Sequence, residues 1–396
     1  MLLCGQGDFF AARRAPWPFL CRRFIFPGVH LPFFPVWLGA QALTPAQISI
    51  VLSGAMLLRI LAGPALAFLA DRAENRRGMI LALAAVSFCA AALYFLADGF
   101  LPIFLISLVL MTLYPSIIPM TESLAMRAVR EEGMDYGRVR LWGSVSFIVA
   151  SYAMGWWLLP GRENHILAAM LFGIALTFSI GFLLPAEGRK DSTAPPLSWA
   201  NALKVLRHPV FLGFVLAAGL TQSSHAFLYA FGSLNWQRLG LSETLIGFLW
   251  ALGVVAEISL FMASAWLARV FGPVGLVVLA AGAGVLRWLI TAQEPGLAVL
   301  CFAQALHGLS FGAAHLGAMH FIARAVAPEL AATAQSLYAA VSGGIMMAGF
   351  MALSGPLYEA AQSTGFYVMA GVALMGAGAA LITWRRWQGG LLVEAA

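Results

Sequence analysis

Twelve long apolar segments, separated by short polar connections, account for nearly all of the chain. A helix that crosses a bilayer needs about 20 predominantly apolar residues. The composition agrees, because 61% of the 396 residues are hydrophobic and only 10% are charged, whereas a globular domain carries about 25% charged residues. We therefore predict an all-α membrane protein of twelve transmembrane helices without a separate soluble domain. The predicted spans are residues 17–40, 45–70, 78–97, 101–126, 138–159, 165–185, 209–236, 243–267, 273–292, 296–323, 331–357 and 364–384.

The first predicted span is the least regular of the twelve. It contains two arginines, and each of its three prolines removes a helical hydrogen bond; these residues are Arg22, Arg23, Pro27, Pro32 and Pro35. The preceding residues, Met1 to Pro18, lack the small-residue cleavage site of a removable signal peptide. Residues 1–25 are therefore either the start of the first helix or an irregular extension before it.

The chain has a formal net charge of +6, and its basic residues lie mainly on one side of the predicted membrane. Cytoplasmic loops are enriched in Lys and Arg, so both termini and the 186–208 segment are predicted to be cytoplasmic, in a multi-pass protein of the cell inner membrane. No nucleic-acid partner is expected. Arg162 and Arg238 are on the opposite side, and Arg59 and Arg287 are within the hydrocarbon region. The remaining 19 of the 23 basic residues are Arg13, Arg14, Arg22, Arg23, Arg72, Arg76, Arg77, Arg127, Arg130, Arg138, Arg140, Arg189, Lys190, Lys204, Arg207, Arg269, Arg324, Arg385 and Arg386.

The two halves of the chain resemble each other, although apolar segments share a small alphabet and coincidence is the alternative explanation. The repeat predicts two pseudo-symmetric six-helix bundles, residues 1–185 and 209–396, joined by a cytoplasmic linker at 186–208 that carries Pro195 and Pro196. Such halves with a central pathway are typical of secondary transporters. A shift of 198 residues places Leu43-Thr44-Pro45 on Leu241-Ser242-Glu243 and Leu69-Ala70-Asp71 on Leu267-Ala268-Arg269, and a shift of 193 places Ala125-Met126-Arg127 on Ala318-Met319-His320.

Ionisable side chains occur inside the predicted spans, where each costs at least a few kcal/mol and usually faces a cavity or a partner. The 198-residue shift places Arg59 on Glu257, and the 193-residue shift places Glu122 on His315. The competing structural interpretations are that Arg59 and Glu257 lock helices together, and that Glu122 forms a loop-end ion pair with Arg140. The candidates are Arg59, Glu122, Arg140, His225, Glu257, Arg287, His307 and His315.

His307, Phe311 and His315 are spaced four residues apart, which predicts one helical stripe. Gly308 and Gly312 on the same helix have the spacing that allows close approach of another helix. The histidines are therefore expected to face protein or a cavity, as hydrogen-bonded groups or as proton carriers. Further aromatic residues offer either stacking surfaces or interfacial anchors; they are Trp142, Phe147, Tyr229, Trp236, Trp250 and Trp288.

The intramembrane charges favour an anionic substrate, because three arginines outnumber two glutamates. Burial raises the pKa of a carboxyl group towards values at which proton exchange is useful. Loading a proton on Glu257 or Glu122 would free an arginine to hold an anion.

Other chemistry has little support in the sequence. The four cysteines, Cys4, Cys21, Cys89 and Cys301, lack metal-ligand spacing. No Walker-type loop is present, and Ser116, Ser224 and Ser310 lie in no nucleophile-elbow pattern. We expect a transporter without metal or cofactor and not an enzyme. A polytopic lipid enzyme or a sensor would need a catalytic cluster at a membrane face or a signalling domain.

Three segments carry a family resemblance: Asp135 to Ser144 (DYGRVRLWGS), Trp250 to Glu257 (WALGVVAE) and Val285 to Trp288 (VLRW). They resemble the phenylpropionate permease group of the major facilitator superfamily. The resemblance implies the major facilitator fold and a proton-coupled symporter of the lactose-permease type, which takes up 3-phenylpropionate or a related small organic acid.

The chain also resembles the more distant lactose permease pattern. Glu122 and Arg140, 18 residues apart, match its acid and arginine, Phe147 matches its substrate-stacking aromatic, and Arg287 and His307 match its arginine-to-histidine spacing. Two expected acids are replaced by Ser310 and His225. The facilitator loop signature after the second span is partial: Asp71 and Arg72 are present, whereas Ala67 and Glu74 replace glycines.

These observations lead to one functional hypothesis: import of a small organic anion by alternating access, driven by the proton gradient, in a monomer within the lipid bilayer. The expected substrate-binding residues are Arg140, Arg287, Glu122, Phe147 and His225. The expected proton-coupling residues are Glu257, Glu122, His307 and His315, and the expected gating or structural residues are Arg59, Asp71 and Arg72. The alternatives are a symporter of a neutral nucleoside or oligosaccharide, and an exporter.

Overall fold

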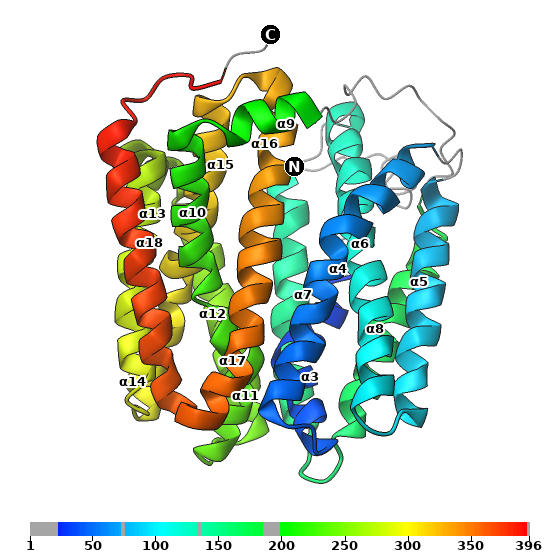
Figure 1. The fold of residues 1–396 in the computed structure, drawn as a ribbon. Helices are drawn as coiled ribbons and strands as arrows, with labels where there is room; N and C mark the ends of the chain where they lie inside the picture. Colours follow the sequence, from blue (N-terminus) through cyan, green and yellow to red (C-terminus); the bar gives the residue numbers. More distant parts are fainter. Residues whose placement is uncertain (1–22, 73–75, 133–135, 185–198, 394–396) are drawn as a thin grey trace, which may run out of the picture.

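The computed structural model describes residues 23–72, 76–132, 136–184 and 199–393, and these residues form a bundle of long helices (Figure 1). The first six helices are α3 (Ile25–Ala40), α4 (Pro45–Arg72), α5 (Arg76–Leu93), α6 (Phe100–Glu132), α7 (Tyr136–Trp157) and α8 (Asn164–Gly181). The later helices are α9 (Trp199–Leu206), α10 (Pro209–Ser223), α11 (Ala226–Arg238), α12 (Glu243–Met262), α13 (Ser264–Thr291), α14 (Leu297–Ala305), α15 (Ala314–Ala325), α16 (Ala331–Tyr338), α17 (Met347–Ala361) and α18 (Phe366–Arg386).

Each of the twelve predicted spans coincides with a helix or with consecutive helical segments among the described residues. Eight helical stretches in this part of the chain are long and apolar enough to cross a membrane, and the shorter apolar helices Ile25–Ala40 and Pro45–Ile60 add to them. The predicted all-α membrane fold is therefore confirmed. The break between the eighth and ninth spans lies at Gly272, whose φ of 63° suits glycine, and Pro273 follows it.

The structure departs from the predicted spans in four places. The first helix of the described residues begins at Ile25, and the predicted start at residue 17 lies outside them. Part of the predicted linker, Trp199–Leu206, is a helix, while 185–198 lies outside the described residues, so the linker boundary stays a prediction. The tenth and eleventh spans each contain a π-helical turn, η2 (Gly308–Ala313) and η4 (Ala339–Met346).

Helix α3 keeps its helical path despite its prolines because neighbouring helices supply the missing donors. Pro27 and Pro32 have no N–H, so the carbonyls four residues earlier, Arg23 and Gly28, lose their helical donor. The Tyr114 hydroxyl of α6 donates to the Arg23 carbonyl at 2.9 Å, and the Ser151 hydroxyl of α7 donates to the Gly28 carbonyl at 2.7 Å. Side-chain donors of this kind make prolines tolerable inside membrane helices.

A third proline is satisfied in the same way, between the two halves of the chain. Pro356 in α17 frees the Ala352 carbonyl, and the Ser49 hydroxyl of α4 donates to that carbonyl at 3.1 Å. This bond joins the second and the eleventh span.

Replacing Ser151 by Ala is expected to destabilise the protein by about 1–3 kcal/mol, because the buried Gly28 carbonyl would lose its donor. The measurement is thermal unfolding in detergent. The control is Ser146→Ala on the same helix, because the exposed Ser146 hydroxyl bonds only within α7, to the Trp142 carbonyl. Equal melting temperatures for the two variants would contradict the assigned role of Ser151.

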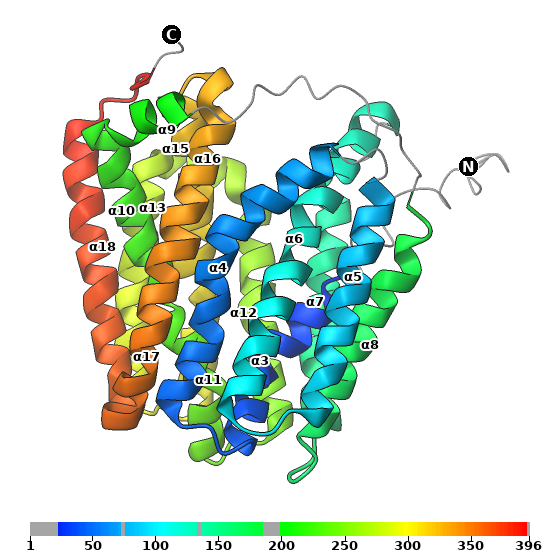
Figure 2. The same ribbon diagram turned by 45° about the vertical axis from the view of Figure 1, so that its right-hand side comes forward.

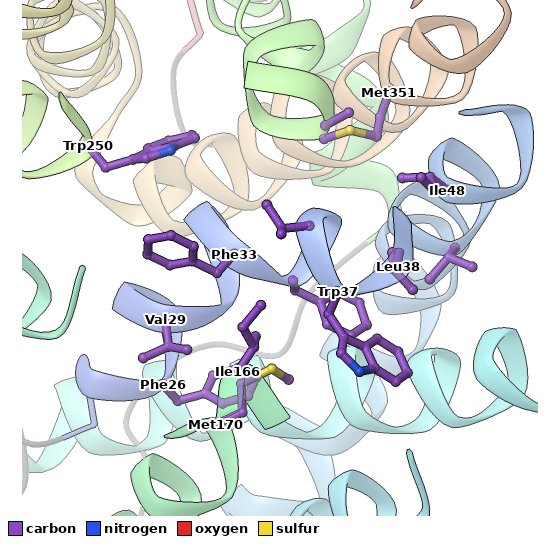
Figure 3. Packing of buried hydrophobic residues seen from close by; sticks show 14 of the residues in the cluster. Phe26, Val29, Phe33, Trp37, Leu38, Ile48, Ile166, Met170, Trp250 and Met351 are labelled. Carbon is purple, nitrogen blue, oxygen red and sulfur yellow. The ribbon is translucent and has the colours of Figure 1, made fainter. Parts of the chain in front are cut away.

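The aromatic core around α3 holds this helix between the two groups of helices. Figure 3 shows Phe33 on the side of α3 that faces Trp250 of α12, and Phe26 near Ile166 and Met170 of α8. The fully buried Trp37 stacks on Phe34 with ring centroids 5.7 Å apart. α3 is therefore an interior helix of the bundle, although it is short.

The two halves touch through symmetry-related pairs of helices. α4 packs on α17, and α12 packs on α7, so the second span meets the eleventh and the eighth meets the fifth. The predicted repeat equates the second span with the eighth, and the same offset equates the fifth with the eleventh. The two contacts are thus equivalent under the pseudo-twofold, which supports the predicted symmetry.

The closest inter-half contacts lie at one end of the bundle, which we call the closed end. A Cβ on Gly155 of α7 would lie 2.3 Å from the Glu243 carbonyl oxygen, and a Cβ on Gly247 of α12 would lie 2.4 Å from the Ser151 carbonyl oxygen. Gly355 of α17 is similarly tight against Pro45 of α4. In Figure 2 this end is at the bottom, away from the C-terminus, and α4 separates from α16 towards the top.

Candidate functional site

A cavity of about 220 Å³ lies between the two halves, halfway along the helices. Its aromatic walls come from both halves: Phe24, Phe147, Tyr229, Trp250 and Phe311. Its ionisable and amide side chains among the described residues come from the second half, Glu257, Arg287, Gln304 and His307, and Ser144 of the first half adds a hydroxyl. The cavity can therefore hold a small molecule with an apolar body and one polar end.

Arg287 of α13 is the centre of the polar wall and is 1% exposed. Its Nη1 lies 3.0 Å from His307 Nδ1 and 3.3 Å from Ser310 Oγ, and its Nη2 donates to Gln304 Oε1 at 2.9 Å. The guanidinium also lies over the Trp288 ring, 4.6 Å from its centroid. All its hydrogen bonds to described residues thus go to neutral groups, so the cation keeps its capacity for an anion.

The partners of the two buried histidines fix which ring nitrogens carry hydrogen. His225 Nδ1 lies 3.0 Å from the Gln222 carbonyl, which only accepts, so Nδ1 is protonated. Its Nε2 lies 3.0 Å from Ser310 Oγ, a hydroxyl that can donate or accept. His307 Nδ1 faces the donor Arg287 and must accept, which leaves its hydrogen on Nε2. The His307 imidazole is therefore neutral in this arrangement.

Glu257 of α12 lies beside His307 on the cavity wall. Its Oε2 is 3.9 Å from His307 Nε2, and both side chains are partly exposed to the cavity, Glu257 at 21% and His307 at 12%. The carboxylate, the imidazole and Arg287 thus form a continuous polar chain. The structure pairs Glu257 with His307 in the same half, whereas the predicted equivalence matched Glu257 with Arg59 across the halves.

The predicted stripe of His307, Phe311 and His315 is wrong in its last member. His307 and Phe311 do stack, with ring centroids 5.1 Å apart. His315, beyond the π-helical turn η2, is an exposed residue 6.5 Å from the Phe261 ring and is not among the residues that line the cavity. The glycine prediction is confirmed, because a Cβ on Gly308 would lie 2.5 Å from the Ala256 carbonyl oxygen of α12.

Arg23, which was counted with the basic residues of the predicted cytoplasmic side, is a buried residue. It is 2% exposed, forms a salt bridge with Glu122 of α6, and donates to the Ile118 carbonyl at 3.1 Å. A buried acid in the fourth span needs a cation, and the partner predicted for it was Arg140. Arg140 belongs to α7, but its side chain lies outside the described residues, as do the side chains of Asp71 and Arg72 at the end of α4.

The remaining predicted residues have clear positions. Phe147 of α7 lines the cavity, and His225 is buried between α10 and α11, where the seventh span breaks. Arg59 is half-buried in α4 and does not line the cavity. Among the predicted stacking aromatics, Tyr229 and Trp250 line the cavity, whereas Trp236 and Trp288 are buried in the core and Trp142 is exposed.

Two residues of the site were not predicted from the sequence. Gln304 is uncharged, so a search for intramembrane charges passes over it; its position three residues before His307, on one helical face, is the pattern that indicates it. Arg23 lies just before α3, and no spacing in the sequence links it to Glu122, its salt-bridge partner.

A symmetric bundle of membrane-crossing helices around a central cavity, closed at one end, defines a secondary transporter. The model of the MFS_1 like family matches residues 24–369. The chain belongs to this family of the major facilitator superfamily and is a transporter of a small molecule, embedded as a multi-pass membrane protein.

Curated relatives and solved structures agree with this assignment. The chain is 32% identical over 357 residues to a protein of Escherichia coli (strain K12) described as "Probable 3-phenylpropionic acid transporter", covering 88% of this chain and 91% of that protein. It is 29% identical over 344 residues to the maltose permease of Geobacillus stearothermophilus, covering 85% of each. The crystal structure of the D323A mutant of the nucleoside transporter NupG is similar in fold, with a TM-score of 0.84 at 16% identity over 94% of this chain and all of that one.

Proposed function

We propose that this transporter imports a small carboxylate with an aromatic or otherwise apolar body, such as 3-phenylpropionate, together with protons. One observation carries the proposal: the buried cation Arg287 stands at the polar end of an aromatic cavity, and its described hydrogen bonds all go to neutral partners. A buried charge in that position gains most from an anionic ligand. The printed description of the relative from Escherichia coli supports the same substrate class.

The chain from Arg287 through His307 to Glu257 supports a mechanism for proton coupling. His307 Nδ1 is occupied by Arg287 in the present arrangement. When a substrate carboxylate draws the guanidinium away, Nδ1 becomes free to take a proton, and Glu257 stabilises the resulting imidazolium. The proton is thus shared by the His307 and Glu257 pair while the anion is bound.

The proposal includes the orientation. The basic residues place both termini on the cytoplasmic side of the inner membrane, so the closed end faces the periplasm and the structure corresponds to the inward-facing state. The cavity has walls from both halves of the chain, and the proposed transport unit is the monomer. No cofactor is required, because the proton gradient supplies the driving force.

A wild-type uptake experiment tests this function. Proteoliposomes are expected to accumulate 3-phenylpropionate when an inward proton gradient is imposed, and only to equilibrate it without one. In binding competition, the acid is expected to bind at least about tenfold more tightly than its uncharged amide, because a hydrogen bond to a charged group contributes about 1.5–3 kcal/mol. Equal affinities for acid and amide, or preferential uptake of a nucleoside or maltose, would overturn the proposal.

A further inference from the structure

Gln304 presents a buried amide group beside Arg287 whose orientation is fixed by its partner. Arg287 Nη2 can only donate, so the Gln304 atom 2.9 Å from it is the carbonyl oxygen Oε1. The amide nitrogen Nε2 therefore points elsewhere, and it is buried without a hydrogen-bond partner among the residues that the structure describes. Gln304 is 2% exposed and lines the cavity.

A second donor beside Gln304 is also unused. The Nε of Arg287 is buried and has no hydrogen-bond partner in the described part of the chain. Each unmade buried bond costs about 1–3 kcal/mol, and native proteins rarely keep such donors without a reason. The polar wall thus has an excess of N–H donors next to a cation, and the missing partner is an acceptor.

A carboxylate is the ligand that meets this need, because it has two acceptor oxygens and a negative charge. We propose that Gln304 is the second binding residue for the substrate carboxylate: its amide N–H groups bind the anion while its carbonyl oxygen holds Arg287 in place. Because Gln304 is neutral, it orients the guanidinium without cancelling its charge. A glutamate at this position would cancel it, so residue 304 determines whether the site accepts an acid.

This inference rests on the proposed function and makes a separate prediction. The probes are 3-phenylpropionate and its primary amide, bound to the purified full-length protein in nanodiscs. Gln304→Met keeps the size of the side chain but removes its amide group. This variant is expected to bind 3-phenylpropionate about tenfold more weakly or worse, while its affinity for the primary amide probe changes by less than about threefold. Gln304→Glu is expected to lower the affinity for the acid at least about hundredfold and to leave the amide bound.

The matched control is Gln222→Met. Gln222 is also buried, but its amide nitrogen donates to the Phe311 carbonyl at 3.4 Å and it does not line the cavity. This variant is expected to keep the wild-type ratio of acid to amide affinity.

The outcomes separate the two claims. If the wild type does not prefer the acid, the proposed function fails. If the wild type prefers the acid and Gln304→Met or Gln304→Glu keeps the same preference, the role of Gln304 fails while the proposed function stands. Should Gln304→Met not yield folded protein, Gln304→Glu alone decides, because loss of acid binding with retained amide binding requires a folded site.

Discussion

Glu257→Gln is expected to abolish accumulation of substrate against a gradient while exchange of internal for external substrate continues. The carboxyl group lies 3.9 Å from His307 and lines the cavity. Glutamine neither takes up a proton nor stabilises an imidazolium, so substrate and proton movements become independent. The substrate contacts at Arg287 and Gln304 remain, and the halves can still reorient with substrate bound. Accumulation in proteoliposomes with an imposed pH gradient should fall to the equilibrium level.

The control for this variant is Glu294→Gln. Glu294 lies in the loop between α13 and α14, where it forms a salt bridge with Arg238 outside the cavity. The Glu294→Gln variant should retain both accumulation and exchange of substrate. If Glu257→Gln still concentrates substrate when the pH gradient is applied, Glu257 is not part of the coupling mechanism.

Gly247→Leu is expected to reduce uptake by at least about a hundredfold, because α12 could no longer pack on α7 at the closed end. Even a Cβ at this position would lie 2.4 Å from the Ser151 carbonyl oxygen. This oxygen belongs to the backbone of α7, so the clash cannot be relieved by a change of side-chain rotamer. Inserting a large side chain into a tightly packed site destabilises a protein by about 1–3 kcal/mol or more. Here it destabilises only the conformation in which the two halves are closed at this end. The variant should therefore favour the state open at this end.

The measurement is chemical labelling of single cysteines placed on the two sides of the cavity, together with substrate binding. Labelling of the cysteine on the side of the closed end should increase. Binding of substrate to the detergent-solubilised variant should persist. Gly282→Leu is the matched control, because nothing lies within 4 Å of a Cβ at Gly282 in α13. Unchanged uptake by Gly247→Leu would show that this contact does not separate during transport.

The general fold was predictable because the bilayer restricts the choices so strongly. Long apolar segments can cross a membrane only as helices or closed barrels, and segments of about 20 residues select helices. The pseudo-twofold followed from short matches such as Leu43-Thr44-Pro45 with Leu241-Ser242-Glu243. The contact of α4 with α17 and of α7 with α12 has that symmetry.

The candidate site was predictable where charge alone identifies a residue. Arg287, Glu257 and His307 are costly in a membrane, and the structure brings them to one wall of the cavity. His315 was misplaced because spacing along a helix does not show how far the cavity extends along it, and the lining ends before this residue. Gln304 was missed because a neutral amide gives no charge signal.

The region around Glu122 shows a different limit. Its partner Arg23 precedes the first regular helix, far away along the chain, and only the tertiary fold brings the two together. From the sequence, an arginine near the N-terminus has the same appearance as the many arginines that flank membrane helices on the cytoplasmic side. Nothing in local spacing distinguishes the two situations.

The bond from Ser49 to the Ala352 carbonyl differs in one respect from the other two bonds that compensate for prolines. Those two join helices of the same half, whereas this one crosses between the halves at the closed end. When the halves part there, Pro356 prevents α17 from supplying a donor of its own, and the exposed carbonyl must find a water molecule. Opening at the closed end is therefore expected to require hydration of this carbonyl: water has to reach the depth of Ala352 when the halves part there.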